Sequence, residues 1–105
     1  MYLNTLGNTN IYDLINEIST SEGIDPKLVH AVVKNESNYN PNAQPPIDPT
    51  TGKRPSSAKG LMQLIDGTAS DMGVQDPFDP RQNLTGGIRY LKKQLKAADG
   101  NVPKL

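Results

Sequence analysis

Apolar residues in this chain recur at the spacing of an α-helix wherever they cluster. The first cluster predicts a helix over about residues 10–20, and the second predicts one from Asp25-Pro26 to about residue 37. The third predicts a last helix over about 80–98, which again begins at an Asp-Pro pair. The three stripes are Ile11, Leu14, Ile15, Ile18; Val29, Val32, Val33; and Leu84, Ile88, Leu91, Leu95. Within these clusters Val and Ile, which favour strands, occur at helical spacing, so the sequence predicts an all-α fold.

The segments between these helices are shorter and less regular. Residues 60–65 are apolar except for Gln63 and predict a short helix, followed by a helical turn over 68–72. Residues 40–58 contain five prolines, a density that forbids a helix and predicts a long loop. Residues 1–9 are polar and predict a disordered or frayed terminus, which leaves 10–105 as the folded domain.

Composition excludes several classes of function. The 105 residues suffice for one domain, and 11 basic against 11 acidic residues give zero net charge, which argues against nucleic acid as a partner. No apolar run approaches the length of a membrane span, and the first residues lack the pattern of a signal peptide. Without Cys there is no thiolate nucleophile, and His30 is the only His. We take His30 as an ordinary helix residue and expect no metal and no cofactor.

Glu36 occupies a place where the second apolar stripe calls for a hydrophobic residue. It lies at i+7 from Val29, and the run from Ser37 to Pro41 ends the helix just behind it. We therefore expect Glu36 to lie on the face of the helix that is buried. A carboxyl group in apolar surroundings tends to keep its proton, which is what a general acid requires. By itself this pattern slightly favours a structural carboxylate bonded to buried backbone groups over a catalytic one.

Further motifs follow Glu36-Ser37 in a fixed order. They are Asn40-Pro41-Asn42-Ala43, then Ala58-Lys59-Gly60-Leu61-Met62-Gln63-Leu64, then Asn83-Leu84 with Gly87-Ile88-Arg89-Tyr90-Leu91. Over about residues 11–105 this order resembles the lytic transglycosylase family, the SLT-type domain related to goose-type lysozyme (glycoside hydrolase family 23). The resemblance implies a lysozyme-like helical domain, here with a long Pro-rich loop.

The resemblance also implies an activity. The family cleaves the β-1,4 bond from N-acetylmuramic acid to N-acetylglucosamine in peptidoglycan and leaves 1,6-anhydro-muramoyl ends. Glu36 corresponds to its single catalytic acid, and the other matching residues imply substrate contacts. The implied substrate-binding set is Ser37, Gly60, Leu61, Met62, Gln63, Tyr90 and, as a sugar-stacking wall, Tyr39. Other roles stay open: Ser37 as a hydroxyl that satisfies the helix end, Met62 as core filler, and Tyr90 as packing against the Glu36 helix.

Two departures from the family pattern bear on activity. Residues 44–57 form a Pro-rich insertion where family members commonly have a shorter loop. The family's Ala-Tyr-Asn-Ala-Gly motif is absent, so we expect a domain that is incomplete at its C-terminus and turns over weakly or not at all.

Two alternatives to the transglycosylase remain. One is a goose-type-like muramidase in which water attacks, and the other is a non-catalytic wall-binding or assembly module with the same fold. A generic helical interaction domain would require the ordered motifs to be coincidence. The resemblance implies peptidoglycan strands as the partner and the periplasm, cell wall or cell exterior as the location. It also suggests that the chain is part of a larger secreted, secretion-system or phage-tail protein.

Overall fold

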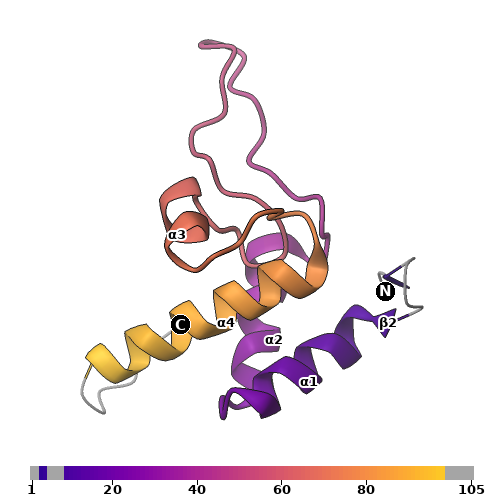
Figure 1. Cartoon of the computed structure of the whole chain (residues 1–105). Coiled ribbons are helices and arrows are strands. Elements are labelled where there is room, and N and C mark those ends of the chain that lie inside the picture. The colour runs from indigo at the N-terminus through magenta and orange to yellow at the C-terminus, as the bar shows by residue number, and fades with distance from the viewer. Residues whose placement is uncertain (1–2, 5–8, 99–105) are drawn as a thin grey trace.

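Helices surround one core, and irregular segments close it from one side (Figure 1). The computed structural model of the chain describes residues 3–4 and 9–98. The helices are α1 (Ile11–Ser21), α2 (Pro26–Ser37), α3 (Asp66–Asp71) and α4 (Pro80–Ala97). The predictions for α1, α2 and α4 are confirmed to within one residue at each end, and so is the all-α class.

Within residues 3–4 and 9–98 the strands amount to one antiparallel pair, β1 (Leu3–Asn4) with β2 (Thr9–Asn10). No alternation in the sequence indicates this pair, in which Leu3 lies opposite Asn10 and Asn4 opposite Thr9. The rest of the terminus predicted to fray lies outside the described residues.

The helices begin where side chains can satisfy their first N–H groups. Asn10, Asp25 and Asp79 each accept a hydrogen bond from the first turn of α1, α2 and α4, at 2.7–2.9 Å. A cap of this kind stabilises a helix by about 1 kcal/mol. Pro26 and Pro80 follow the two aspartates at the start of the helix, where the missing N–H costs nothing. The Asp-Pro pairs therefore fix where α2 and α4 begin.

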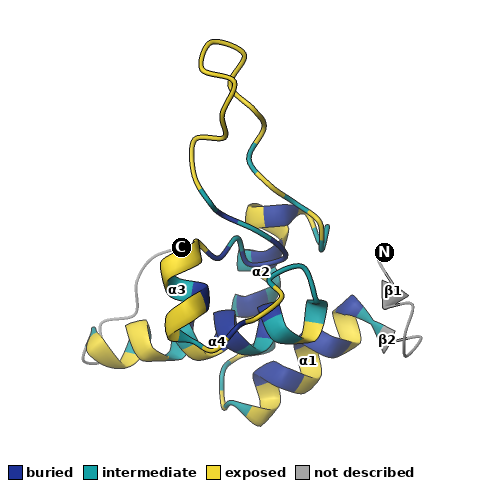
Figure 2. Ribbon diagram, turned by 45° about the horizontal axis from the view of Figure 1, so that its top comes forward, coloured by how far each residue is buried: buried dark blue, intermediate teal, exposed yellow. Residues whose placement is uncertain are grey.

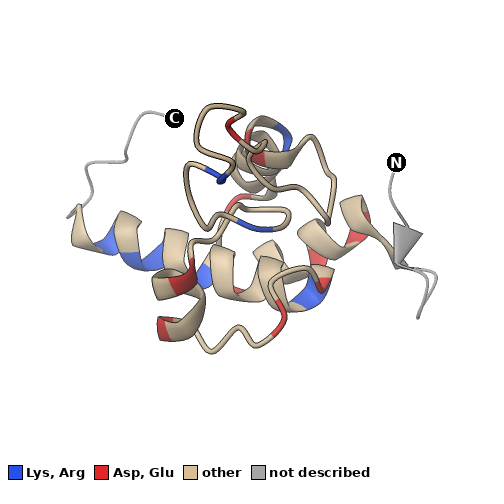
Figure 3. Ribbon diagram, turned by 90° about the horizontal axis from the view of Figure 1, so that it is seen from above, with Lys and Arg blue, Asp and Glu red and all other residues tan. Residues whose placement is uncertain are grey.

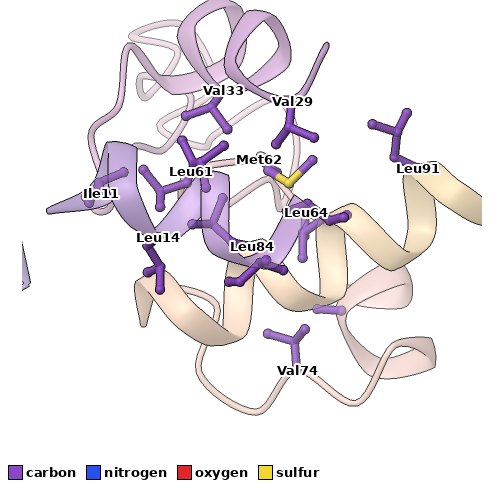
Figure 4. Packing of buried hydrophobic residues seen from close by; sticks show 14 residues of the cluster. Ile11, Leu14, Val29, Val33, Leu61, Met62, Leu64, Val74, Leu84 and Leu91 are labelled. Atoms are coloured by element: carbon purple, nitrogen blue, oxygen red, sulfur yellow. The ribbon is translucent and has the colours of Figure 1, made fainter. Parts of the chain in front are cut away.

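The core lies where the apolar faces of α1, α2 and α4 meet. Side chains from α1, α2, α4 and the segment 61–74 converge there in close contact (Figure 4). Its largest fully buried side chains are Ile11, Leu14, Ile15, Val29, Val33, Leu61, Leu84 and Ile88. The two other stripe positions of α4 are also covered, since Leu91 is buried and Leu95 packs against the core at its edge.

Ion pairs on the surface join α1 to α4 at both ends of their contact. Arg81 of α4 donates to Glu17 at 2.7 Å, and Arg89 donates to Glu22, which follows α1, at 3.0 Å. Figure 3 shows the basic positions along α4 and the acidic ones on α1. Exposed pairs of this kind add little stability each, so burial of the apolar faces holds the two helices together.

The prediction of a short helix over residues 60–65 is wrong. Lys59 and Leu64 form a backbone bridge, with N–H to O distances of 3.0 and 3.1 Å, and residues 60–63 make the turn between them. Gly60 and Gln63 have φ of 80° and 52°, left-handed values that an α-helix does not allow. Apolar content alone cannot separate a buried turn from a helix in so short a run. We call residues 59–64 the bridge turn.

The Pro-rich loop extends away from the helices, as predicted for an irregular segment (Figures 1 and 2). Residues 46–56 are all exposed. Asp48 and Lys53 pair through their backbones at 2.8 Å, and Arg54 donates to the carbonyl of Pro45 at 2.6 Å. These bonds lie within the loop, so its outer part is ordered by its own contacts.

Candidate functional site

A hollow of about 260 Å³ lies beside the C-terminal half of α2. The bridge turn, the first residues of α3 and the second half of α4 form its other walls. Most of the lining is apolar, and the polar side chains in it come from all four of these elements. The lining residues are Val32, Glu36, Met62, Gln63, Leu64, Ile65, Thr68, Gly87, Tyr90, Leu91 and Gln94.

Glu36 stands at this hollow with its carboxylate free. The expectation that Glu36 lies on the buried face is wrong: its neighbours in the stripe, Val29 and Val33, are fully buried, whereas Glu36 is exposed. The helix carries Glu36 past the edge of the core, so the position that continues the stripe opens onto the hollow. No group within residues 3–4 and 9–98 forms a hydrogen bond or ion pair with its carboxylate.

A second hollow of about 390 Å³ also lies against α2. Ala31 and Asn35 line it, and it shares Val32 and Glu36 with the first hollow. Glu36 therefore borders two adjacent spaces at once. An elongated ligand that occupied both would pass directly over this carboxylate.

Gln63 lines the first hollow, and its amide orientation is fixed by two backbone carbonyls. Its Nε2 donates to the carbonyls of Ala43 and Gly60, both at 2.9 Å. Because two acceptors define the nitrogen, the other terminal atom is the oxygen Oε1. Within the described part of the chain nothing donates to this oxygen, so it stays available to accept from a ligand hydroxyl or amide.

The rest of the predicted Gly-Leu-Met-Gln motif divides between site and core. Met62 is buried in the core and also lines the hollow. Leu61 is fully buried in the core and does not line either hollow. Gly60 is buried too, and a side chain there would overlap Asn83 and the carbonyl of Pro77. Gly60 therefore serves packing within the protein rather than approach of a ligand.

One face of α4 forms the opposite wall. Gly87, Tyr90, Leu91 and Gln94 lie at i, i+3, i+4 and i+7, which brings them onto the same side of the helix. Tyr90 was predicted as a site residue and does line the hollow. Gln94 was missed, although its spacing of four residues from Tyr90 was the signal that could have found it.

The structure does not bring Ser37 and Tyr39 to the hollow. Ser37 is buried, and its Oγ donates to the carbonyl of Val33 at 3.0 Å, which matches the alternative role of satisfying the helix end. The ring of Tyr39 stacks on Tyr12 with centroids 4.5 Å apart, and its hydroxyl lies 3.2 Å from Nδ1 of His30. Tyr39 therefore joins α2 to α1 and does not form a wall of either hollow.

Two further observations bear on cofactors and membranes. In the part of the chain that the structure describes, no three His, Cys, Asp or Glu side chains come together as they would around a metal ion. Among the same residues, none of the helices combines the length and apolar character that crossing a bilayer requires.

The helical fold, with Glu36 at the border of two hollows, is of the lysozyme-like class, and comparison with known proteins places it more closely. Residues 13–105 match the family described as "Transglycosylase SLT domain". The chain belongs to this family.

Several named relatives share a third or more of the aligned residues. The membrane-bound lytic murein transglycosylase F of Desulfosudis oleivorans is 40% identical over 80 residues, which cover 76% of this chain and 16% of that protein. The transglycosylase of Enterobacteria phage PRD1 is 38% identical over 84 residues, or 80% of this chain and 28% of that protein. The murein transglycosylase F of Serratia proteamaculans is 38% identical over 81 residues, or 77% and 15%. The chain thus spans less than a third of the length of these relatives.

Proposed function

We propose that this chain binds peptidoglycan strands and cleaves the β-1,4 bond from N-acetylmuramic acid to N-acetylglucosamine, with Glu36 as the catalytic residue. The observation that carries the proposal is the place of Glu36 at the junction of two hollows. A glycan strand has sugar units on both sides of the bond to be cleaved, and two adjacent hollows offer a seat for each side. Membership of the SLT transglycosylase family supports this choice of substrate.

The chemistry assigned to Glu36 has two proton transfers. The carboxyl group first gives its proton to the glycosidic oxygen, the bond from C1 to that oxygen breaks, and the N-acetylglucosamine chain leaves as an alcohol. The carboxylate then takes the proton of the C6 hydroxyl of the muramoyl residue, and O6 bonds to C1 to form the 1,6-anhydro ring. Glu36 ends protonated, as it began, and no water is consumed.

A single carboxylate is enough for this reaction. Ordinary glycosidases place a second carboxylate near the first, as a nucleophile or as a base for water. None of the described residues that line the two hollows is acidic apart from Glu36. In the proposed reaction the attacking hydroxyl belongs to the substrate, so proximity replaces the second carboxylate.

The exposed position of Glu36 in the free protein suggests how the glycan would help catalysis. Sugar rings that filled both hollows would displace water from the carboxyl group, and exclusion of water strengthens the hydrogen bond from an acid to the glycosidic oxygen. Oε1 of Gln63 would accept a hydrogen bond from a sugar hydroxyl or N-acetyl N–H, and Tyr90 would line the opposite side. By this proposal the site acts on the cell wall, from the periplasm or the cell exterior.

A matched pair of Glu→Gln variants tests the proposal. Glu36→Gln removes the proton donor with almost no change in shape, and Glu17→Gln makes the same change on α1, away from both hollows. The readout is the rate at which soluble fragments are released from purified peptidoglycan at high protein concentration. General acid–base catalysis is worth about 10²–10⁴-fold, so Glu36→Gln should lower release at least about 100-fold while Glu17→Gln releases fragments at the wild-type rate.

Two results would contradict the proposal. Equal release by Glu36→Gln and wild type would remove Glu36 from the reaction. Binding of the wild type to peptidoglycan without any release would support a wall-binding module that shares the fold.

A further inference from the structure

We propose that Asn83 and Gly87 of α4 are positioning residues, which set the place of Met62 and Gln63 relative to Glu36. The expected effect of these two residues on glycan cleavage rests on the proposed function. The placement itself is carried by contacts within the protein, between α4 and the bridge turn.

Asn83 uses its whole side-chain amide to hold the bridge turn. It is fully buried, and its Oδ1 accepts from the backbone N–H of Met62 at 2.8 Å. Its Nδ2 donates to the carbonyl of Lys59 at 3.0 Å and to that of Pro77 at 2.8 Å. One side chain thus ties Lys59 and Met62 of the bridge turn to the start of α4, in surroundings where an unpaired polar group is costly.

Two glycines give this arrangement the close approach that it needs. A Cβ at Gly60 would overlap the amide of Asn83, and a Cβ at Gly87 would overlap the sulfur of Met62. The absence of a side chain at Gly60 therefore leaves space for Asn83, and its absence at Gly87 leaves space for Met62. With Asn83 holding the backbone of Met62 and Gly87 receiving its side chain, Met62 is located at two points one helical turn apart on α4.

The consequence reaches Gln63, the next residue. The backbone N–H of Gln63 bonds to the carbonyl of Gly60 at 3.1 Å, and its Nε2 reaches the carbonyl of Ala43, in the segment that follows α2. The bridge turn is therefore bonded to α4 on one side and, on the other, to the segment that follows α2, the helix that carries Glu36. Moving Met62 away from α4 would move the free oxygen of Gln63 with respect to Glu36.

The adjacent glycine supplies a control on the same helix. A Cβ at Gly86 would overlap Cγ2 of Val74, which does not line the hollows beside Glu36. Both Gly→Ala substitutions occur inside α4, and both should gain about 1 kcal/mol of helix propensity. At Gly86 the new methyl group would meet the end of the Val74 side chain, and at Gly87 it would meet the sulfur of Met62 and, less closely, its Cβ and Cγ. The two substitutions differ in whether the displaced side chain belongs to the candidate site.

The test compares Gly87→Ala with Gly86→Ala, by two readouts. NMR gives the resonances of the Met62 methyl group and of the Met62 and Gln63 amides without any glycan. The initial rate of fragment release from peptidoglycan gives the functional effect. We expect Gly87→Ala to shift these resonances and to lower the rate about tenfold or more, since displacements near 1 Å are known to cost that much. Gly86→Ala should change neither.

A double substitution separates positioning from simple obstruction of the hollow. Met62→Ala removes the sulfur that the new methyl group of Gly87→Ala would push. If Gly87 acts through Met62, then adding Gly87→Ala to Met62→Ala should lower the rate no further. A full additional loss would show that the methyl group blocks the glycan directly and would overturn the assignment of Gly87.

The NMR readout keeps the proposal apart from the proposed function. Wild-type resonances for Met62 and Gln63 in Gly87→Ala would overturn the positioning role even if peptidoglycan is cleaved. If Gly87→Ala shifts these resonances and Gly86→Ala does not, the positioning role is supported even if the wild type releases no fragments. The absence of release would count against the proposed function. Asn83→Ala is the weaker variant, because it strands three backbone groups and loss of the fold would resemble loss of positioning.

Discussion

Glu36 differs from the other two glutamates of the chain in having no partner among the described residues. Glu17 pairs with Arg81 at 2.7 Å, and Glu22 pairs with Arg89 at 3.0 Å. Both of these serve the contact between α1 and α4. A carboxylate that bonds to nothing in the protein keeps its oxygens for a ligand, and Glu36 is the one that borders the hollows.

Ser19 is the residue that the fold satisfies least well. It lies fully buried on α1, and its Oγ is the one buried side-chain polar atom of the described residues that lacks a hydrogen bond. Burying an unsatisfied hydroxyl costs about 1–3 kcal/mol. We therefore expect Ser19→Ala to raise the free energy of unfolding by about 1 kcal/mol and the Tm by about 4–8 °C.

Thermal unfolding of Ser19→Ala and Ser21→Ala tests this expectation. Ser21 is exposed near the end of the same helix, so its substitution changes helix propensity without removing a buried hydroxyl. A Tm for Ser19→Ala at or below that of the wild type would show that the hydroxyl is satisfied in solution.

At the scale of elements, a histidine joins α1 to α2 on the side away from the hollows. Nε2 of His30 lies 2.8 Å from Oδ1 of Asn16, and Nδ1 lies 3.2 Å from the hydroxyl of Tyr39. In the neutral ring Nε2 donates and Nδ1 accepts, which fits both partners. Burial lowers the pKa of His30 below its ordinary value of 6.5.

This shift predicts how stability depends on pH. Because the pKa of His30 is lower in the folded chain, the unfolded chain takes up the proton first as the pH falls. The contribution of His30 to stability is therefore present above about pH 6.5 and is lost as the pH falls below it. The free energy of unfolding, measured in urea, should decrease from pH 7.5 toward pH 5.5. For His30→Gln the free energy of unfolding should decrease less over the same range.

The titration of Glu17 does not contribute to the change in stability between pH 5.5 and 7.5. Its hydrogen bond with Arg81 lowers its pKa from the ordinary 4.5, so its contribution is lost only at more acid pH. Equal slopes for His30→Gln and the wild type between pH 5.5 and 7.5 would contradict the role given to His30.

The elements also show how far the sequence could predict this site. The helical spacing of apolar residues was enough to predict α1, α2 and α4, because each of these helices buries a continuous apolar stripe. The Asp-Pro pairs also indicated where α2 and α4 begin. These local patterns failed for the bridge turn, where the amides of Asn83 and Gln63 replace helical hydrogen bonds with partners 20 or more residues away. No local pattern encodes such contacts. Ser37 and Tyr39 were placed in the site because of the family resemblance, whereas their hydrogen bonds go to residues nearby in the sequence, Val33 and His30.

For the molecule as a whole, the site exists only where distant segments meet. Glu36 was found from its motif and its place on the helix, but its exposure depends on where the core ends. The walls come from α2, the bridge turn, α3 and α4, which the chain order alone does not bring together. The order of motifs was enough for the family, and the arrangement of these walls supports the proposal that a glycan passes over Glu36.

The mass of the fragments released from peptidoglycan tests the central claim most directly. If Glu36 acts alone and the C6 hydroxyl of the substrate attacks, the muramoyl ends carry a 1,6-anhydro ring and are lighter by one water than reducing ends. We expect the wild type to release anhydro ends and Glu36→Gln to release almost none. Release of reducing ends by the wild type would show that water attacks, as in a muramidase, and would contradict the account.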